Sequence, residues 1–152
     1  MFELPRGVTG FGIDSPAAEV AARRDAFITW ARAVAAELGS AAVECPLDVP
    51  VPSFDTVELA RLDCWLLHNR YVPLVGVLTT APEPGGAWAV AGEWWDLEIP
   101  PHLTTWGPPV LAADELNAPL RTSLDELGPG AREQADRYKP ETAGHLIFNY
   151  WV

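Results

Sequence analysis

Lysine is almost absent from this sequence, and positive charges of any kind are few. Lys139 is the only lysine among 10 basic residues, which face 21 acidic ones, so the formal net charge is −11 over 152 residues. Surfaces that bind nucleic acids need clustered cations to contact phosphates. We therefore expect no nucleic-acid partner. The acidity suits a basic protein partner, although it also promotes solubility.

Long apolar runs are missing as well. No segment approaches the roughly 18 to 20 apolar residues of a membrane span. The first residues, Met1 to Arg6, have neither the charged start nor the apolar stretch of a secretory signal. We therefore expect no membrane association and a cytoplasmic location, where Cys45 and Cys64 remain reduced.

Recurrent motifs for cofactors and metals are also lacking. The glycines form neither a P-loop nor a dinucleotide fingerprint, and the three histidines stand apart without the short-range ligand pairs of zinc sites. Cys64 and His68 have the residue types of a thiol nucleophile and its base. On a strand they would lie about 13 Å apart, beyond hydrogen-bonding reach. We expect no cofactor, no metal and no catalytic residue of these kinds, and favour a role other than catalysis.

Hydrophobic residues make up 49% of the chain, enough for the core of a single domain over residues 1–152. The clearest predicted element is a helix over residues 16–38. Ser15 is a suitable N-cap, Pro16 fits the first helical position, and Gly39 is a good stop. An apolar stripe at helical spacing follows Ala17, Val20, Phe27, Ala31, Val34 and Leu38.

Strands are predicted after a proline-containing connector at residues 46–53. β-forming residues favour strands over 57–68, 74–80 and 87–94, which we interpret as a three-stranded antiparallel meander. Prolines and glycines indicate a surface loop over 95–109. Short helices are predicted at 114–117, 131–138 and 140–151, with a capping box at Ser123 and Glu126. The fold class is therefore α+β, with a long N-terminal helix packed on a small antiparallel meander and a helical C-terminal third.

The most unusual pattern is the placement of charge. Between Tyr71 and Leu120 there is no Lys or Arg, while six carboxylates fall in this stretch: Glu83, Glu93, Asp96, Glu98, Asp114 and Glu115. Such carboxylates repel one another unless they are solvated or meet a cation. The pattern is compatible with a solvated acidic face, with a docking surface for a basic partner, or with a metal or catalytic carboxylate site.

Tryptophan is abundant, with seven residues, and its placement beside the acidic segment favours docking. Trp94 and Trp95 would point to opposite faces of an extended segment, so we expect one in the core and the other partly exposed. An exposed aromatic residue among carboxylates is a suitable binding hot spot. The predicted binding residues are Glu93, Trp94, Trp95, Asp96, Glu98 and Trp106.

The C-terminal end carries a resemblance. Residues Lys139 to Trp151, with their Pro, Gly, Phe-Asn and Trp pattern, resemble the close of small uncharacterised proteins from GC-rich actinobacteria, although Val152 stands where an acidic residue is expected. This resemblance implies no activity. The small, acidic α and β build is similar in type to bacterial immunity proteins, which neutralise a toxin.

These observations leave three functional hypotheses. The first is a non-enzymatic immunity or inhibitor-type protein, a monomer or homodimer that binds a basic partner, such as a toxin, through residues 93–106. The second is a small-molecule-binding protein or an enzyme of secondary metabolism, with a tryptophan-lined pocket whose polar groups are Asp63, His68 and Asn69. The third is a homo-oligomeric structural protein with the C-terminal aromatic segment as its interface.

Overall fold

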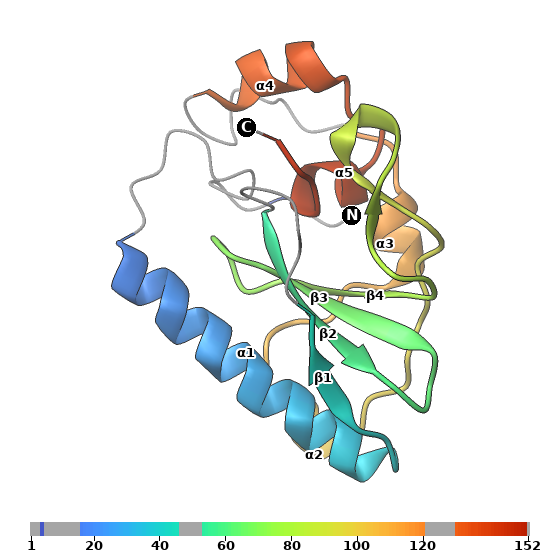
Figure 1. Cartoon of the computed structure of the whole chain (residues 1–152). Coiled ribbons are helices and arrows are strands. Elements are labelled where there is room, and N and C mark those ends of the chain that lie inside the picture. The colour runs from blue at the N-terminus through green and yellow to red at the C-terminus, as the bar shows by residue number, and fades with distance from the viewer. Residues whose placement is uncertain (1–3, 5–15, 46–52, 121–129, 152) are drawn as a thin grey trace.

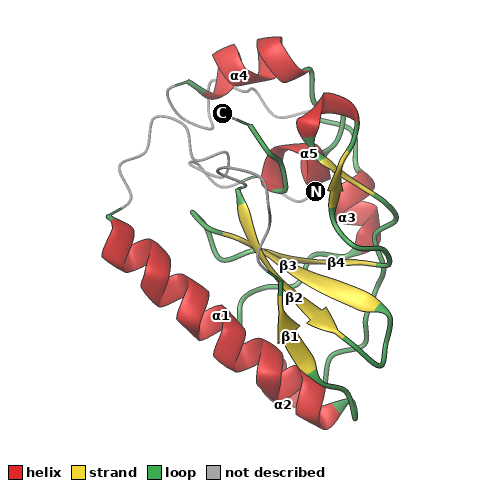
Figure 2. Cartoon of the chain, in the orientation of Figure 1, coloured by secondary structure: helices red, strands yellow, loops and turns green. Residues whose placement is uncertain are grey.

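The fold is α+β, as the sequence predicts (Figures 1 and 2). The computed structural model describes residues 4, 16–45, 53–120 and 130–151. The expected N-cap Ser15, most of the connector and the capping box at Ser123 and Glu126 lie outside these ranges. The elements are α1 (Ala17–Glu37), β1 (Ala42–Glu44), β2 (Phe54–Leu59), β3 (Cys64–Asn69), β4 (Val75–Leu78), β5 (Glu83–Pro84), the 3-10 turn η1 (Gly86–Trp88), β6 (Val90–Ala91), α2 (Pro101–Thr104), α3 (Ala113–Asn117), α4 (Ala131–Tyr138) and α5 (Ala143–Ile147).

The main sheet is an antiparallel meander of four strands in the order β1-β2-β3-β4. The single strand predicted over 57–68 is wrong, because the chain turns between Leu59 and Cys64, which pair with each other. Asp63 closes this turn in the left-handed region, with φ at 50°. Aspartate tolerates this conformation better than most residues because its side chain can bond locally.

Residues 87–94 do not form the predicted third strand of the meander. Ala87 and Trp88 have positive φ, and the two residues of β6 pair with β5 in a separate small sheet. Leu78 of β4 nevertheless forms a bridge with Trp94. Residues 87–94 therefore lie outside the meander, except that Trp94 pairs with the outer edge of β4.

The main sheet is covered on both faces, which gives three layers (Figure 1). Alternate residues of β2 and β3, such as Val57 and Leu66, pack in the core beneath α1. Phe54 and Leu67 belong to the second core, on the opposite face, together with residues of α3, α5 and the C-terminal segment. Burial on both faces explains why β4 is apolar throughout.

Helix α1 packs on the sheet through its C-terminal half. Phe27, Ala31 and Val34 of the predicted stripe are buried, whereas Ala17 is exposed. Gly39 ends the helix as predicted: its φ is +68°, and Ser40 N donates to Ala35 O at 2.8 Å. The first turn of α1, residues 17–19, is therefore exposed.

The C-terminal helix is shorter than the predicted 140–151. It ends at Ile147, and Asn149 Nδ2 bonds back to Leu146 O at 3.0 Å. The chain then runs extended, with Tyr150 N donating to Trp88 O at 2.8 Å. Because Phe148, Tyr150 and Trp151 are buried, they are unavailable as an exposed interface for self-association.

Within the described ranges, every helix is too short or too polar to cross a membrane.

Candidate functional site

The predicted docking segment lies along the outer edge of β4. Thr79 N donates to the carbonyl of Glu93 at 3.1 Å, and Trp95 N donates to Val77 O at 2.9 Å. Trp94 turns into the core, where its ring centroid is 5.2 Å from that of Phe148. Trp95 remains 39% exposed. The pair is therefore divided between core and surface, as the sequence predicts.

The predicted carboxylates have different roles. Glu93 and Glu98 are exposed. Asp96 Oδ1 instead accepts the N–H of Ala113 at 2.7 Å, at the start of α3, and so satisfies a donor that the helix leaves free. Around the tryptophan pair, Glu93, Trp95 and Glu98 are therefore exposed, and Asp96 is exposed as well but bonds to the start of α3.

Trp106 belongs to a different feature, a pocket of about 490 Å³ between α1 and the loop that follows α2. Trp106 is 53% exposed at this site. We call it the aromatic pocket. Its lining comprises Arg23, Ala26, Phe27, Thr29, Trp30, His68, Pro73, Trp106, Gly107, Pro108 and Pro109.

Three contacts fix the loop of the aromatic pocket in place. Trp30 Nε1 donates to Leu103 O at 2.8 Å, which ties the indole to α2. Gly107 packs directly on this indole, because a Cβ at that position would overlap the ring. Val75 N donates to Pro109 O at 2.9 Å and joins the loop to β4. The walls of the pocket are therefore held by the sheet and by α1.

His68 contributes a buried polar group to the aromatic pocket. Its side chain is 2% exposed and stacks on Phe27, with ring centroids 4.7 Å apart. Burial, followed by the nearby charge of Arg23, lowers the pKa of His68 to about 4. The ring is therefore neutral near pH 7, and its Nδ1 has no hydrogen-bond partner among the described residues.

The other two polar residues expected in a tryptophan-lined pocket do not join His68. Asp63 is exposed in the turn at the far end of β3. Asn69 Nδ2 donates to Ile147 O at 2.7 Å, and Asn69 Oδ1 accepts from Tyr71 N at 2.8 Å. Asn69 therefore joins the strand end to the C-terminal segment and has a structural role.

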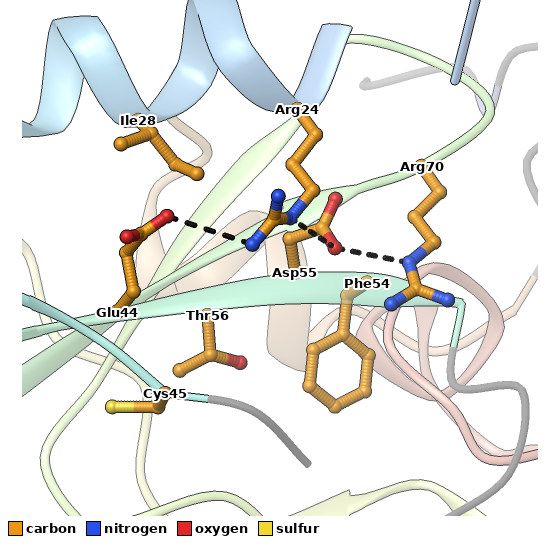
Figure 3. Close-up of a pocket in the computed structure, with 8 residues that line it drawn as sticks. All are labelled: Arg24, Ile28, Glu44, Cys45, Phe54, Asp55, Thr56 and Arg70. Atoms are coloured by element: carbon orange, nitrogen blue, oxygen red, sulfur yellow. Dashed lines mark hydrogen bonds and ion pairs between the residues drawn. The ribbon is translucent and has the colours of Figure 1, made fainter. Parts of the chain in front are cut away.

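A second pocket, of about 530 Å³, lies on the other side of α1 (Figure 3). We call it the arginine pocket. Its lining comprises Arg24, Ile28, Glu44, Cys45, Phe54, Asp55, Thr56 and Arg70. This pocket could not be predicted from the sequence, because its lining residues come from separate parts of the chain: α1, β1 and the residue after it, β2, and the segment after β3.

The centre of the arginine pocket is an ion-pair cluster around Asp55. Arg70 Nε lies 3.1 Å from Asp55 Oδ1, and Arg24 Nε lies 3.7 Å from the same oxygen. Arg24 also reaches Glu44 Oε1 at 3.5 Å. Asp55 is only 7% exposed. The cluster therefore joins α1 to β1, to β2 and to the segment after β3.

The two cysteines are free. Cys64 is buried in the core beneath α1, and burial, followed by the charge of Asp63, raises the pKa of its thiol to about 11. A thiol with that pKa is protonated near pH 7 and is a poor nucleophile. Among the residues that the structure describes, no group of three metal-ligating side chains converges.

No protein-family model, curated protein or solved structure matches the chain. The functional assignment therefore depends on the geometry of the sites. The structure is an α+β domain with one pocket on each side of its long helix, α1.

Proposed function

We propose that this protein binds a small, flat organic molecule in the aromatic pocket. The observation that carries the proposal is a cavity of about 490 Å³ whose lining includes Phe27, Trp30, His68 and Trp106. Small-molecule sites occupy roughly 300–1,000 Å³ and combine apolar walls with a few polar groups. Both features are present here.

The lining defines the chemistry of the ligand. Trp106 is half exposed and offers a stacking surface, whereas Trp30 is buried and its N–H is already bonded. The neutral ring of His68 offers a nitrogen to a polar group of the ligand. Arg23 supplies a cation, which suits an anionic substituent. We therefore expect a flat aromatic body that carries a single acidic group.

A fluorescence titration with anilinonaphthalene sulfonate tests this proposal, since the probe combines aromatic rings with one anionic group. Trp106→Ala should weaken binding by about tenfold, because an aromatic stacking contact is worth roughly 1 kcal/mol beyond its buried area. Trp88→Ala is the matched control, because Trp88 is 56% exposed and lies outside the pocket lining.

The proposal predicts saturable binding by the wild type and by Trp88→Ala, with a loss in Trp106→Ala. A parallel thermal-shift screen with aromatic acids should raise the melting temperature of the same two proteins. Equal binding by all three proteins, or no stabilisation by any aromatic acid, would contradict it.

A second candidate function is docking of a basic protein partner, such as a toxin. It is favoured by the exposed ring of Trp95, which lies between Glu93 and Glu98 in a stretch of sequence without basic residues. Rigid aromatic rings are common hot spots, and carboxylates accelerate association with a cationic partner.

Reversal of charge tests the docking hypothesis. The double variant Glu93→Lys and Glu98→Lys should lose a basic protein that the wild type retains from a lysate of the source cells. Asp96 stays unchanged because it caps α3. Trp88→Ala serves again as the control. Retention of the same proteins by the double variant would reject docking at this edge.

A further inference from the structure

The arginine pocket contains a buried carboxylate oxygen that no described residue satisfies. Arg70 donates a hydrogen bond to Asp55 Oδ1 and Arg24 forms an ion pair with the same oxygen, whereas Asp55 Oδ2 is buried and has no hydrogen-bond partner within the described ranges. An unsatisfied buried acceptor is costly, and native structures contain few of them. A hydrogen-bond donor from a ligand would relieve this cost, and a cationic donor would do so best.

Arg70 offers the complementary group. Its Nε bonds to Asp55 Oδ1, while its two terminal nitrogens point away from that carboxylate (Figure 3). These nitrogens have no hydrogen-bond partner among the described residues. A guanidinium edge with free N–H groups is suited to a carboxylate.

The charges of the lining balance one another. Arg24 and Arg70 are matched by Glu44 and Asp55. An anionic ligand without a cation would leave Asp55 Oδ2 unsatisfied, and a cation without an anion would face two arginines. A zwitterion meets both requirements.

We propose that the arginine pocket binds a free α-amino acid with an apolar side chain. Its ammonium group donates to Asp55 Oδ2, and its carboxylate accepts from the terminal nitrogens of Arg70. Ile28 provides an apolar contact for the side chain. This site is separate from the aromatic pocket and does not depend on its function.

Isothermal titration with L-leucine and two analogues tests the proposal. N-acetyl-L-leucine lacks the ammonium group, and L-leucinamide lacks the carboxylate. We expect saturable binding of L-leucine, with at least tenfold weaker binding of each analogue, because each loses one charge-assisted hydrogen bond. Absence of L-leucine binding at millimolar concentration, or equal binding of N-acetyl-L-leucine, would overturn the proposal.

Two variants localise the site, and a third serves as control. Asp55→Asn keeps the shape of the side chain but removes its charge, and Arg70→Gln removes the guanidinium. Both should weaken L-leucine binding by about tenfold or more. Arg61→Gln, at an exposed arginine outside the pocket, should bind like the wild type. Wild-type affinity in Asp55→Asn would overturn the assignment.

Cross-testing keeps the two pockets distinct and detects misfolding. Asp55→Asn should still bind anilinonaphthalene sulfonate, and Trp106→Ala should still bind L-leucine. The analogue comparison uses only the wild-type protein, so it remains decisive if a variant fails to fold.

Discussion

At the scale of single residues, the features that matter most are buried polar side chains on the face of the sheet beneath α1. His68 and Asp55 lie opposite each other in the register of β2 and β3. His68 stacks on Phe27 and stays neutral, whereas Asp55 is paired with two arginines. A short stretch of sheet therefore contributes one polar group to each pocket.

Burial of a neutral His68 makes the stability of the protein depend on pH. The folded-state pKa of about 4 lies below the value of about 6.5 expected in the unfolded chain. The unfolded state therefore binds a proton first as the pH falls. The stabilisation by His68 is complete above about pH 6.5 and is lost progressively between about pH 6.5 and pH 4.

His68→Phe should reduce this dependence while keeping a ring against Phe27. Between about pH 7 and pH 4.5, the wild type should lose about 2 kcal/mol more free energy of unfolding than the variant. Urea denaturation at the two pH values measures the difference. Parallel losses in both proteins would show that His68 is not buried as a neutral ring.

At the scale of elements, α1 illustrates how a local signal specifies a boundary. Gly39 ends the helix in the left-handed region, and no atom lies within 4 Å of the position that a Cβ would occupy. A side chain at this position would therefore meet no steric clash with other residues. Any loss of stability on substitution would come from the backbone conformation alone.

Gly39→Ala should lower the free energy of unfolding by about 1 kcal/mol, the usual penalty for an alanine in the left-handed region. Gly86→Ala is the matched control, because Gly86 also has open space around it but lacks a positive φ. Chemical denaturation should place the control close to the wild type. Equal losses in both variants would contradict a conformational origin.

Elements that depend on local sequence signals could be predicted from the sequence, whereas elements that depend on distant contacts could not. The stripe of Phe27, Ala31 and Val34 and the stop at Gly39 are local, so α1 was predictable. The turn before Cys64 contains no Gly, Pro or Asn, so the apolar pattern reads as one continuous strand. The chain after Ile147 leaves the helix because it pairs with residues far away in sequence.

At the scale of the whole molecule, α1 forms a wall of both pockets, and the sheet supplies residues to each. The sequence identified His68 and Trp106 individually but could not bring them together, because α1 and the loop after α2 meet only in the folded chain. Strand alternation does explain why Asn69 is absent from the aromatic pocket: neighbouring residues of β3 face opposite sides. The acidic segment lies on the outer edge of β4 and contributes only Trp106 to a pocket.

Fluorine NMR of protein labelled with fluorotryptophan tests the central claim most directly. Each of the seven tryptophans gives its own resonance, which single Trp→Phe variants assign. On titration with anilinonaphthalene sulfonate, we expect the resonances of Trp30 and Trp106 to shift, while those of Trp88 and Trp151 remain in place. A shift of Trp95 with Trp106 unchanged, or no shift at all, would contradict ligand binding in the aromatic pocket.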